Sequence, residues 1–142
     1  MNRGNSAIYD HKKFIVVLAS EGRVGEEAAR SAAAIEKKYA EQFGHFLVTV
    51  HPASTPGEVV GKGSNTHHAL HQVREKIIDA QGIEYKNILT SIIDCDTVVY
   101  PDYFNCLVWH FFTAENPYKS AFQPVPLFTN NLWDAPALSR VM

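Results

Sequence analysis

Phe14-Ile15-Val16-Val17-Leu18-Ala19 is a continuous apolar run, rich in β-branched residues, near the start of the chain. Such a run suits a strand of a parallel sheet that is buried on both faces, whereas a strand with one solvated face would alternate apolar and polar residues. Between residues 26 and 43 the apolar positions recur at helical spacing, and Gly44 follows where a helix C-cap would lie. We therefore expect a buried strand followed by an amphipathic helix.

The segments that follow predict further elements of the same kind. A second short strand is expected at residues 46–50, then a long loop rich in proline and glycine, and then a helix to about Ala80 that Ser64 or Asn65 would cap. The later elements are predicted to be a third buried strand at residues 88–93, a helix at 101–115 and an irregular or edge strand at 122–128. Right-handed crossovers would join the strands into one sheet, so the expected fold class is α/β, a three-layer sandwich with a mostly parallel sheet in one domain over residues 1–142.

The composition limits the classes of function. A chain of 142 residues with 46% hydrophobic residues can bury a core, and its net charge of −2 leaves no positive excess for nucleic acid to find. Cys95 and Cys106 are too few for a disulfide framework and favour a reducing compartment. Because no apolar leader and no apolar run of about 18 residues occurs, we expect this fragment to be soluble.

Two segments, separated in the chain, predict a site for a nucleotide diphosphate. Lys62 lies between two glycines just before a predicted helix, where free backbone amides and the helix dipole favour an anion. Asp94 and Asp96 follow the predicted third strand, and carboxylates at i and i+2 of a strand end would offer Mg²⁺ or Mn²⁺ hard oxygen ligands on one side. The alternatives are a solvated lysine in a flexible loop and two aspartates in an ordinary turn.

Other groups have simpler interpretations. His67 and His71 lie one helical turn apart, but no acidic or cysteine partner stands near them in sequence, so we do not expect a zinc site. The four bulky residues 109–112 would cover most of a helix circumference, which predicts burial. Gln123 and the aromatic and amide residues after it form a combination that sugar sites use, and also one that ordinary loops contain.

Several strings, in their order and spacing, resemble family 2 glycosyltransferases. They are Val48-Thr49-Val50-His51-Pro52, then Gly61-Lys62-Gly63-Ser64-Asn65, then Ile92-Ile93-Asp94-Cys95-Asp96, and then Pro101-Asp102-Tyr103-Phe104. The later segment 122–130, with Trp133-Asp134 after it, is similar to the stretch that follows the Asp-x-Asp motif in cellulose-synthase-like, membrane-associated members. The resemblance covers roughly residues 14–140.

The resemblance implies a GT-A (Rossmann-like) fold and inverting transfer from a nucleotide-diphosphate sugar to a carbohydrate or lipid-linked acceptor. It implies that Lys62, Asn65, Asp94 and Gln123 bind the donor, and that Asp94 and Asp96 bind Mg²⁺ or Mn²⁺, with Asp96 in direct contact with the metal. It assigns no catalytic residue, because the acidic Glu-Asp motif that holds the family's base is not found in this sequence.

The family's opening Pro-x-x-Asn-Glu-like turn and its downstream Gln-x-x-Arg-Trp segment are not found either. The expectation is therefore a central, truncated fragment of a larger enzyme, inactive alone, whose full-length form lies at the cytoplasmic side of a membrane. Two other functions stay open: a nucleotidyltransferase, and a non-catalytic nucleotide-binding or assembly domain. A homodimer through an exposed sheet edge is a further alternative.

Overall fold

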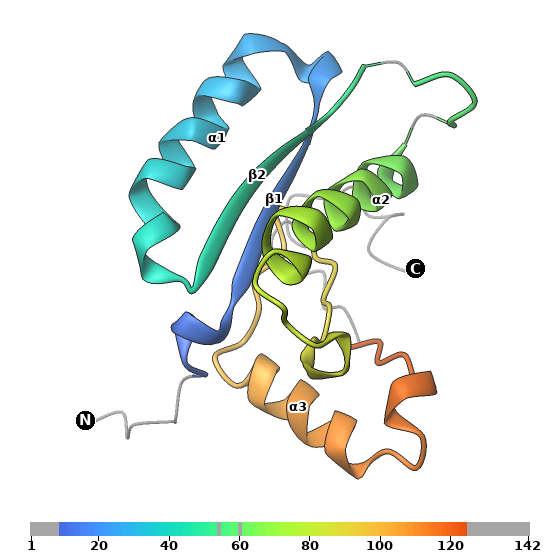
Figure 1. Ribbon diagram of the computed structural model, residues 1–142. Coiled ribbons are helices and arrows are strands. Elements are labelled where there is room, and N and C mark those ends of the chain that lie inside the picture. Colours follow the sequence, from blue (N-terminus) through green and yellow to red (C-terminus); the bar gives the residue numbers. More distant parts are fainter. Residues whose placement is uncertain (1–8, 54, 60, 125–142) are drawn as a thin grey trace, which may run out of the picture. The chain divides into compact units, whose positions relative to one another are not determined.

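The computed structural model describes residues 9–53, 55–59 and 61–124. These residues form two parallel strands, three α-helices and several short 3₁₀ or π-helical segments (Figure 1). The chain divides into two units, residues 1–104 and 105–142. The first unit contains both strands and the first two helices. The protein is thus a small α/β structure, as the sequence predicts at this coarse level.

The sheet pairs β1 (Ile15–Glu21) with β2 (His45–His51) in parallel, from Ile15 opposite His45 to Glu21 opposite His51. Helix α1 (Gly25–Tyr39) connects the strands and is followed by a 3₁₀ turn, Ala40–Gln42. Helices α1 and α2 (Lys62–Val73) lie on opposite sides of the two strands (Figure 1). The predicted strands at 14–19 and 46–50 and the predicted helix at 26–43 are therefore confirmed to within a few residues.

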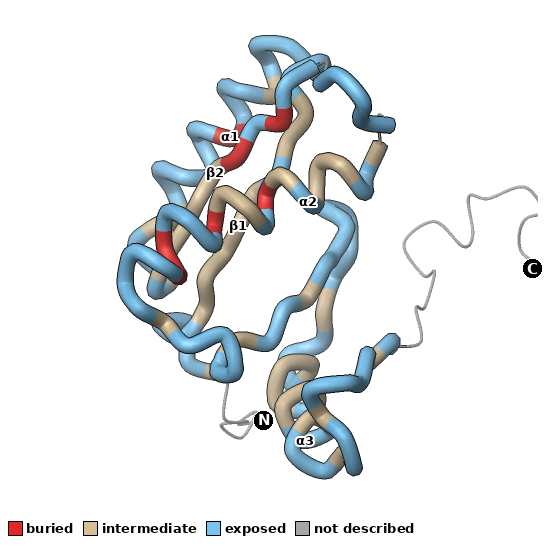
Figure 2. The backbone as a smooth tube through the Cα atoms, turned by 45° about the vertical axis from the view of Figure 1, so that its right-hand side comes forward, coloured by how far each residue is buried: buried red, intermediate tan, exposed pale blue. Residues whose placement is uncertain are grey.

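The core lies where α2 and its continuation cover the strands. Helix α2 passes directly into a π-helical segment, Arg74–Asp79, so the predicted helix to about residue 80 is also confirmed. The buried cluster consists of Val73, Ile77 and Ile78. Around it pack the half-buried residues Ile15, Val17, Leu47, Ile83 and Ile88. The buried positions along α2 stand out in Figure 2.

The third strand predicted at residues 88–93 is wrong for this structure, because these residues have no regular secondary structure. Leu89, Ile92 and Ile93 are exposed, and the sheet formed by the described residues has two strands. An apolar run matches the pattern of a buried strand, but a strand also needs a backbone partner for its N–H and C=O groups. The three-layer sandwich is therefore not confirmed.

Helix α3 (Tyr103–Thr113) agrees with the helix predicted at 101–115, but the burial predicted for residues 109–112 is wrong. Trp109 is 61% exposed and Phe112 is 77% exposed, and no residue of α3 is buried. A helix with bulky apolar residues on every side is buried only if other parts of the chain pack around it. The local sequence pattern does not say whether such packing partners exist. None of the described helices is long and apolar enough to cross a membrane.

The last predicted element falls at the edge of the described residues. Within the irregular strand predicted at 122–128, residues 122–124 have no regular secondary structure, and residues 125–128 lie outside the described ranges. Trp133-Asp134 also lies outside them.

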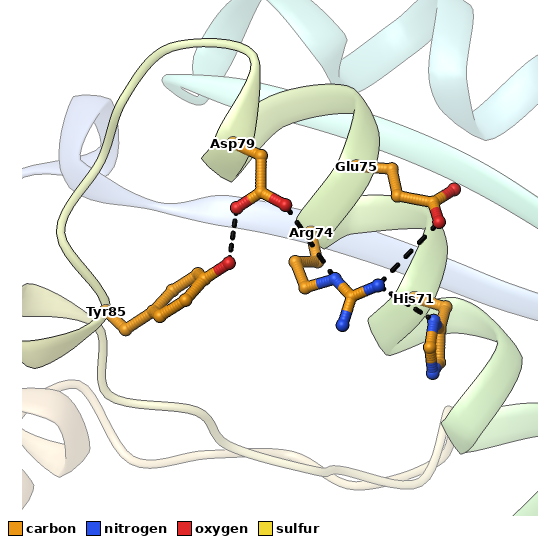
Figure 3. A network of polar contacts seen from close by, with 5 residues as sticks. All are labelled: His71, Arg74, Glu75, Asp79 and Tyr85. Carbon is orange, nitrogen blue, oxygen red and sulfur yellow. Dashed lines mark hydrogen bonds and ion pairs between the residues drawn. The ribbon is translucent and has the colours of Figure 1, made fainter.

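A polar network fixes the turn after the π-helical segment (Figure 3). The guanidinium of Arg74 lies 3.8 Å from a carboxylate oxygen of Asp79 and 3.7 Å from one of Glu75, and it donates a hydrogen bond of 3.3 Å to Nδ1 of His71. The phenol of Tyr85 points at Asp79 and donates a hydrogen bond to its other carboxylate oxygen. The network thus joins the end of the helix to the segment that leads toward residues 88–93.

The Tyr85 phenol should titrate above the usual tyrosine pKa of about 10. Its hydrogen bond to Asp79 raises the pKa, burial and the negative charge of Asp79 add to the rise, and Arg74 opposes it. The folded state favours the neutral phenol. The contribution of the Tyr85–Asp79 hydrogen bond to the free energy of unfolding is therefore complete below about pH 10, and it is lost as the pH rises through the raised pKa. Ultraviolet absorbance of tyrosinate, as the difference between wild type and Tyr85→Phe, measures this titration. The substitution Asp79→Asn should return the pKa toward its usual value, and an unchanged pKa in that variant would contradict the assignment.

Candidate functional site

The segment that carries Lys62 forms the start of α2. The helix begins at Lys62 with Gly61 as its N-cap, so the prediction that Ser64 or Asn65 caps the helix is wrong. The Asn65 N–H donates to the Gly61 carbonyl at 3.2 Å, and the Ser64 hydroxyl donates to the same oxygen at 2.9 Å. The first N–H groups of a helix have no intrahelical acceptor, and an anion binds favourably there. Lys62 thus lies in the first turn, where an anion would bind.

Lys62 forms an ion pair with Asp94, which lies 32 residues further along the chain. Both side chains are largely exposed. An ion pair between exposed side chains contributes little to stability, because water competes for both charges. Its importance here is its position, since it joins the two segments that the sequence predicts to share a site.

Asp94 and Asp96 lie in a turn and not at a strand end, which corrects the geometry expected from the sequence. The Asp94 carbonyl accepts a hydrogen bond of 3.0 Å from the Thr97 N–H, and all four residues of this turn, Asp96 included, are exposed. Within the described ranges there is no group of three or more histidine, cysteine or acidic side chains that could hold a metal ion. The two carboxylates nevertheless suit Mg²⁺ or Mn²⁺, because these ions often take one or two carboxylates and complete their shell with phosphate oxygens and water.

The other two residues predicted to bind the donor, Asn65 and Gln123, belong to different units of the chain. Asn65 is half-buried on the first turns of α2, and its side-chain oxygen Oδ1 is buried without a hydrogen-bond partner among the described residues. A buried acceptor without a partner is costly unless a ligand or water donates to it. Gln123 belongs to the second unit, where it is exposed in a segment without regular structure.

A small cleft lies at the carboxyl ends of β1 and β2. Its lining includes Glu21 and His51, which are register partners at the ends of the two strands, together with Glu58 and Ser64. Ligands of parallel α/β sheets gather at this edge. The cavity volume is about 10 Å³, which is room for about one water molecule and not for a nucleotide.

His51, which lines the cleft, contacts both Glu58 and His68. The Nε2–H of His51 donates a hydrogen bond of 2.8 Å to a carboxylate oxygen of Glu58. Its ring stands perpendicular to the ring of His68 on α2, with centroids 5.1 Å apart. The signal in the sequence is the position of His51 at the end of an apolar strand and before a proline.

Comparison with known proteins gives no match: no family model, curated protein or solved structure is similar to this chain. The likeness to family 2 glycosyltransferases therefore rests on the residues quoted above.

Proposed function

We propose that this chain binds the diphosphate of a nucleotide sugar together with Mg²⁺ or Mn²⁺, as the donor-side part of a family 2 glycosyltransferase. The observation that carries the proposal is the contact between Lys62 and Asp94, because it joins a lysine at a helix N-terminus to the Asp-x-Asp segment. The two residues lie 32 positions apart in the chain, and the ion pair brings their side chains together.

The chemistry of the joined segments fits a diphosphate. Lys62 and the free N–H groups of the first turn of α2 would offset the phosphate charge. Asp94 and Asp96 would hold the divalent ion, which when bound would stabilise the charge on the departing nucleoside diphosphate. Asp94 would then exchange its contact with Lys62 for the ion, which leaves the ammonium of Lys62 to the phosphates.

In the full-length enzyme an acceptor hydroxyl, on a carbohydrate or a lipid-linked acceptor, would attack the anomeric carbon with inversion after a base removes its proton. We assign no residue of this chain as that base. By its likeness to membrane-associated members, the enzyme would work at the cytoplasmic side of a membrane. The complete GT-A sandwich would require residues 88–93 to pair with a strand edge, and β1 pairs only with β2 among the described residues.

Titration calorimetry of uridine diphosphate, with and without Mn²⁺, tests the proposal. We expect binding that depends on Mn²⁺, and a loss of affinity of about tenfold or more in Asp96→Asn and in Lys62→Gln, because each variant removes a charged contact with the diphosphate or its metal. The matched control is Asp102→Asn, which removes an exposed carboxylate outside the proposed site and should bind like wild type.

Each other outcome has a defined meaning. Unchanged affinity in Asp96→Asn would sink the metal assignment, and unchanged affinity in Lys62→Gln would sink the phosphate assignment. No binding by wild type would overturn the proposal for this chain.

A non-catalytic assembly domain is the second candidate. It is favoured by the exposed Trp109 and Phe112 of α3, because large exposed apolar side chains gather where partners bind. Hydrolysis of a nucleotide sugar by the isolated chain would count against it, as would any transfer to an added acceptor.

A further inference from the structure

The loop between β2 and α2 is closed by a contact at its base. His51 is the last residue of β2 and is only 9% exposed, and its Nε2 lies 2.8 Å from a carboxylate oxygen of Glu58. A turn just before this contact, in which the Glu58 N–H donates to the Thr55 carbonyl at 3.2 Å, brings Glu58 back toward the strand. The loop therefore returns to the sheet at Glu58 and does not hang free from residue 52 to α2.

The histidine of this contact is held from a second direction. His68, on α2, places its ring perpendicular to the ring of His51. Glu21, which pairs with Arg23, lines the same cleft from the end of β1. His51 thus contacts the loop through Glu58 and the helix through His68, and it links the two segments that flank Lys62 in the chain.

The distance along the chain from Glu58 to Lys62 is short. Four peptide steps separate them, and an extended chain of that length spans at most about 14 Å. Anchoring Glu58 to the end of β2 therefore limits where the first turn of α2 and its lysine can lie. Without the anchor, the free loop would run from residue 52 to α2, and ordering it on ligand binding would cost conformational entropy.

We infer that His51 and Glu58 form a clamp that positions the start of α2, and with it Lys62, for the anion. Both are positioning residues, since they act through the loop and helix. The clamp itself is independent of the ligand, but its effect on anion binding rests on the function proposed above.

Two measurements on the same variants test the inference. The first is the rate at which proteinase K cleaves the loop at 52–61, with the cleavage sites mapped by mass spectrometry. The second is calorimetric affinity for inorganic pyrophosphate with Mn²⁺. The variants are Glu58→Ala, which removes the clamp, and Glu58→Gln, which keeps an oxygen acceptor for His51. The control is Glu36→Ala, which removes an exposed glutamate in the last turn of α1.

We expect Glu58→Ala to raise loop cleavage and to weaken pyrophosphate binding, each about fivefold or more, because a hydrogen bond to a charged group is lost. Glu58→Gln should restore most of both values, and Glu36→Ala should match wild type. Glu58 is 34% exposed, so its truncation leaves the buried cluster around Ile77 intact. His51→Gln, which keeps an N–H donor, provides a second conservative variant.

The outcomes separate the clamp from the proposed function. If loop cleavage is the same in Glu58→Ala and wild type, the clamp is overturned. If cleavage rises but pyrophosphate affinity is unchanged, the positioning role is overturned. If wild type binds no pyrophosphate, the proposed function fails for this anion, and the proteolysis alone then decides whether the clamp exists.

Discussion

Replacing Ile77 with alanine should lower the free energy of unfolding by about 2–4 kcal/mol. Ile77 is 8% exposed and lies in the π-helical segment, in the buried cluster with Val73 and Ile78. The substitution removes three side-chain carbons from the buried cluster. Because the cluster residues keep a little solvent exposure, neighbouring side chains can partly fill the space that is left. Urea denaturation followed by far-ultraviolet circular dichroism measures the change, at a constant slope against denaturant.

The matched control for this substitution is Ile92→Ala. Ile92 is 60% exposed in the segment where the sequence predicts a third buried strand. In the structure described here its truncation should change stability by less than about 0.5 kcal/mol. A loss comparable to that of Ile77→Ala would contradict the exposed conformation of residues 88–93. It would support the strand that the GT-A proposal requires.

Replacing Gly44 with alanine should destabilise the fold by about 1–3 kcal/mol or more. Gly44 comes just before β2, and its N–H donates to the His11 carbonyl at 3.3 Å. A Cβ atom at this position would meet the Lys12 carbonyl oxygen closer than non-bonded atoms approach, and it would lie 3.1 Å from the Phe14 carbonyl oxygen. Both obstacles are backbone atoms, so relief requires moving the chain where β2 begins beside β1.

Gly63→Ala is the control for that steric effect. A Cβ at Gly63 meets no described atom within 4 Å, and alanine is favoured over glycine in a helix by about 0.5–1 kcal/mol. The control should therefore be as stable as wild type or slightly more so. Thermal unfolding of the two variants measures the contrast, and a Gly44→Ala protein as stable as Gly63→Ala would show that the close approach does not exist.

Gly44 is a special backbone position, as the sequence predicts, but for a different structural reason. The sequence predicts it as a helix C-cap, yet α1 ends at Tyr39, a 3₁₀ turn follows, and Phe43 caps that turn. Gly44 is instead required because the chain passes close to the backbone of residues 12–14. A glycine in a sequence marks a special backbone position, but the partner that makes the position special comes from elsewhere in the chain.

The sequence by itself determined the elements whose pattern is local. The β-branched run that opens β1, the helical spacing of α1 and the apolar run of β2 were each predictable, because every strand or helix of this kind repeats its apolar positions with its own period. From the chemistry that each segment offers an anion and a metal, it also predicted that Lys62 and Asp94 share a site, and the shared site stays a prediction.

The tertiary structure alone decided which apolar residues have neighbours. Residues 88–93 and α3 have the apolar composition of buried elements, but several of their apolar side chains are exposed. It alone brought Lys62 to Asp94 and Glu58 back to His51, because each contact depends on where a loop returns. The spacing of apolar residues along a helix or strand shows which face of that element is apolar enough to be buried. Pairing, burial and loop closure depend on atoms supplied by distant parts of the chain.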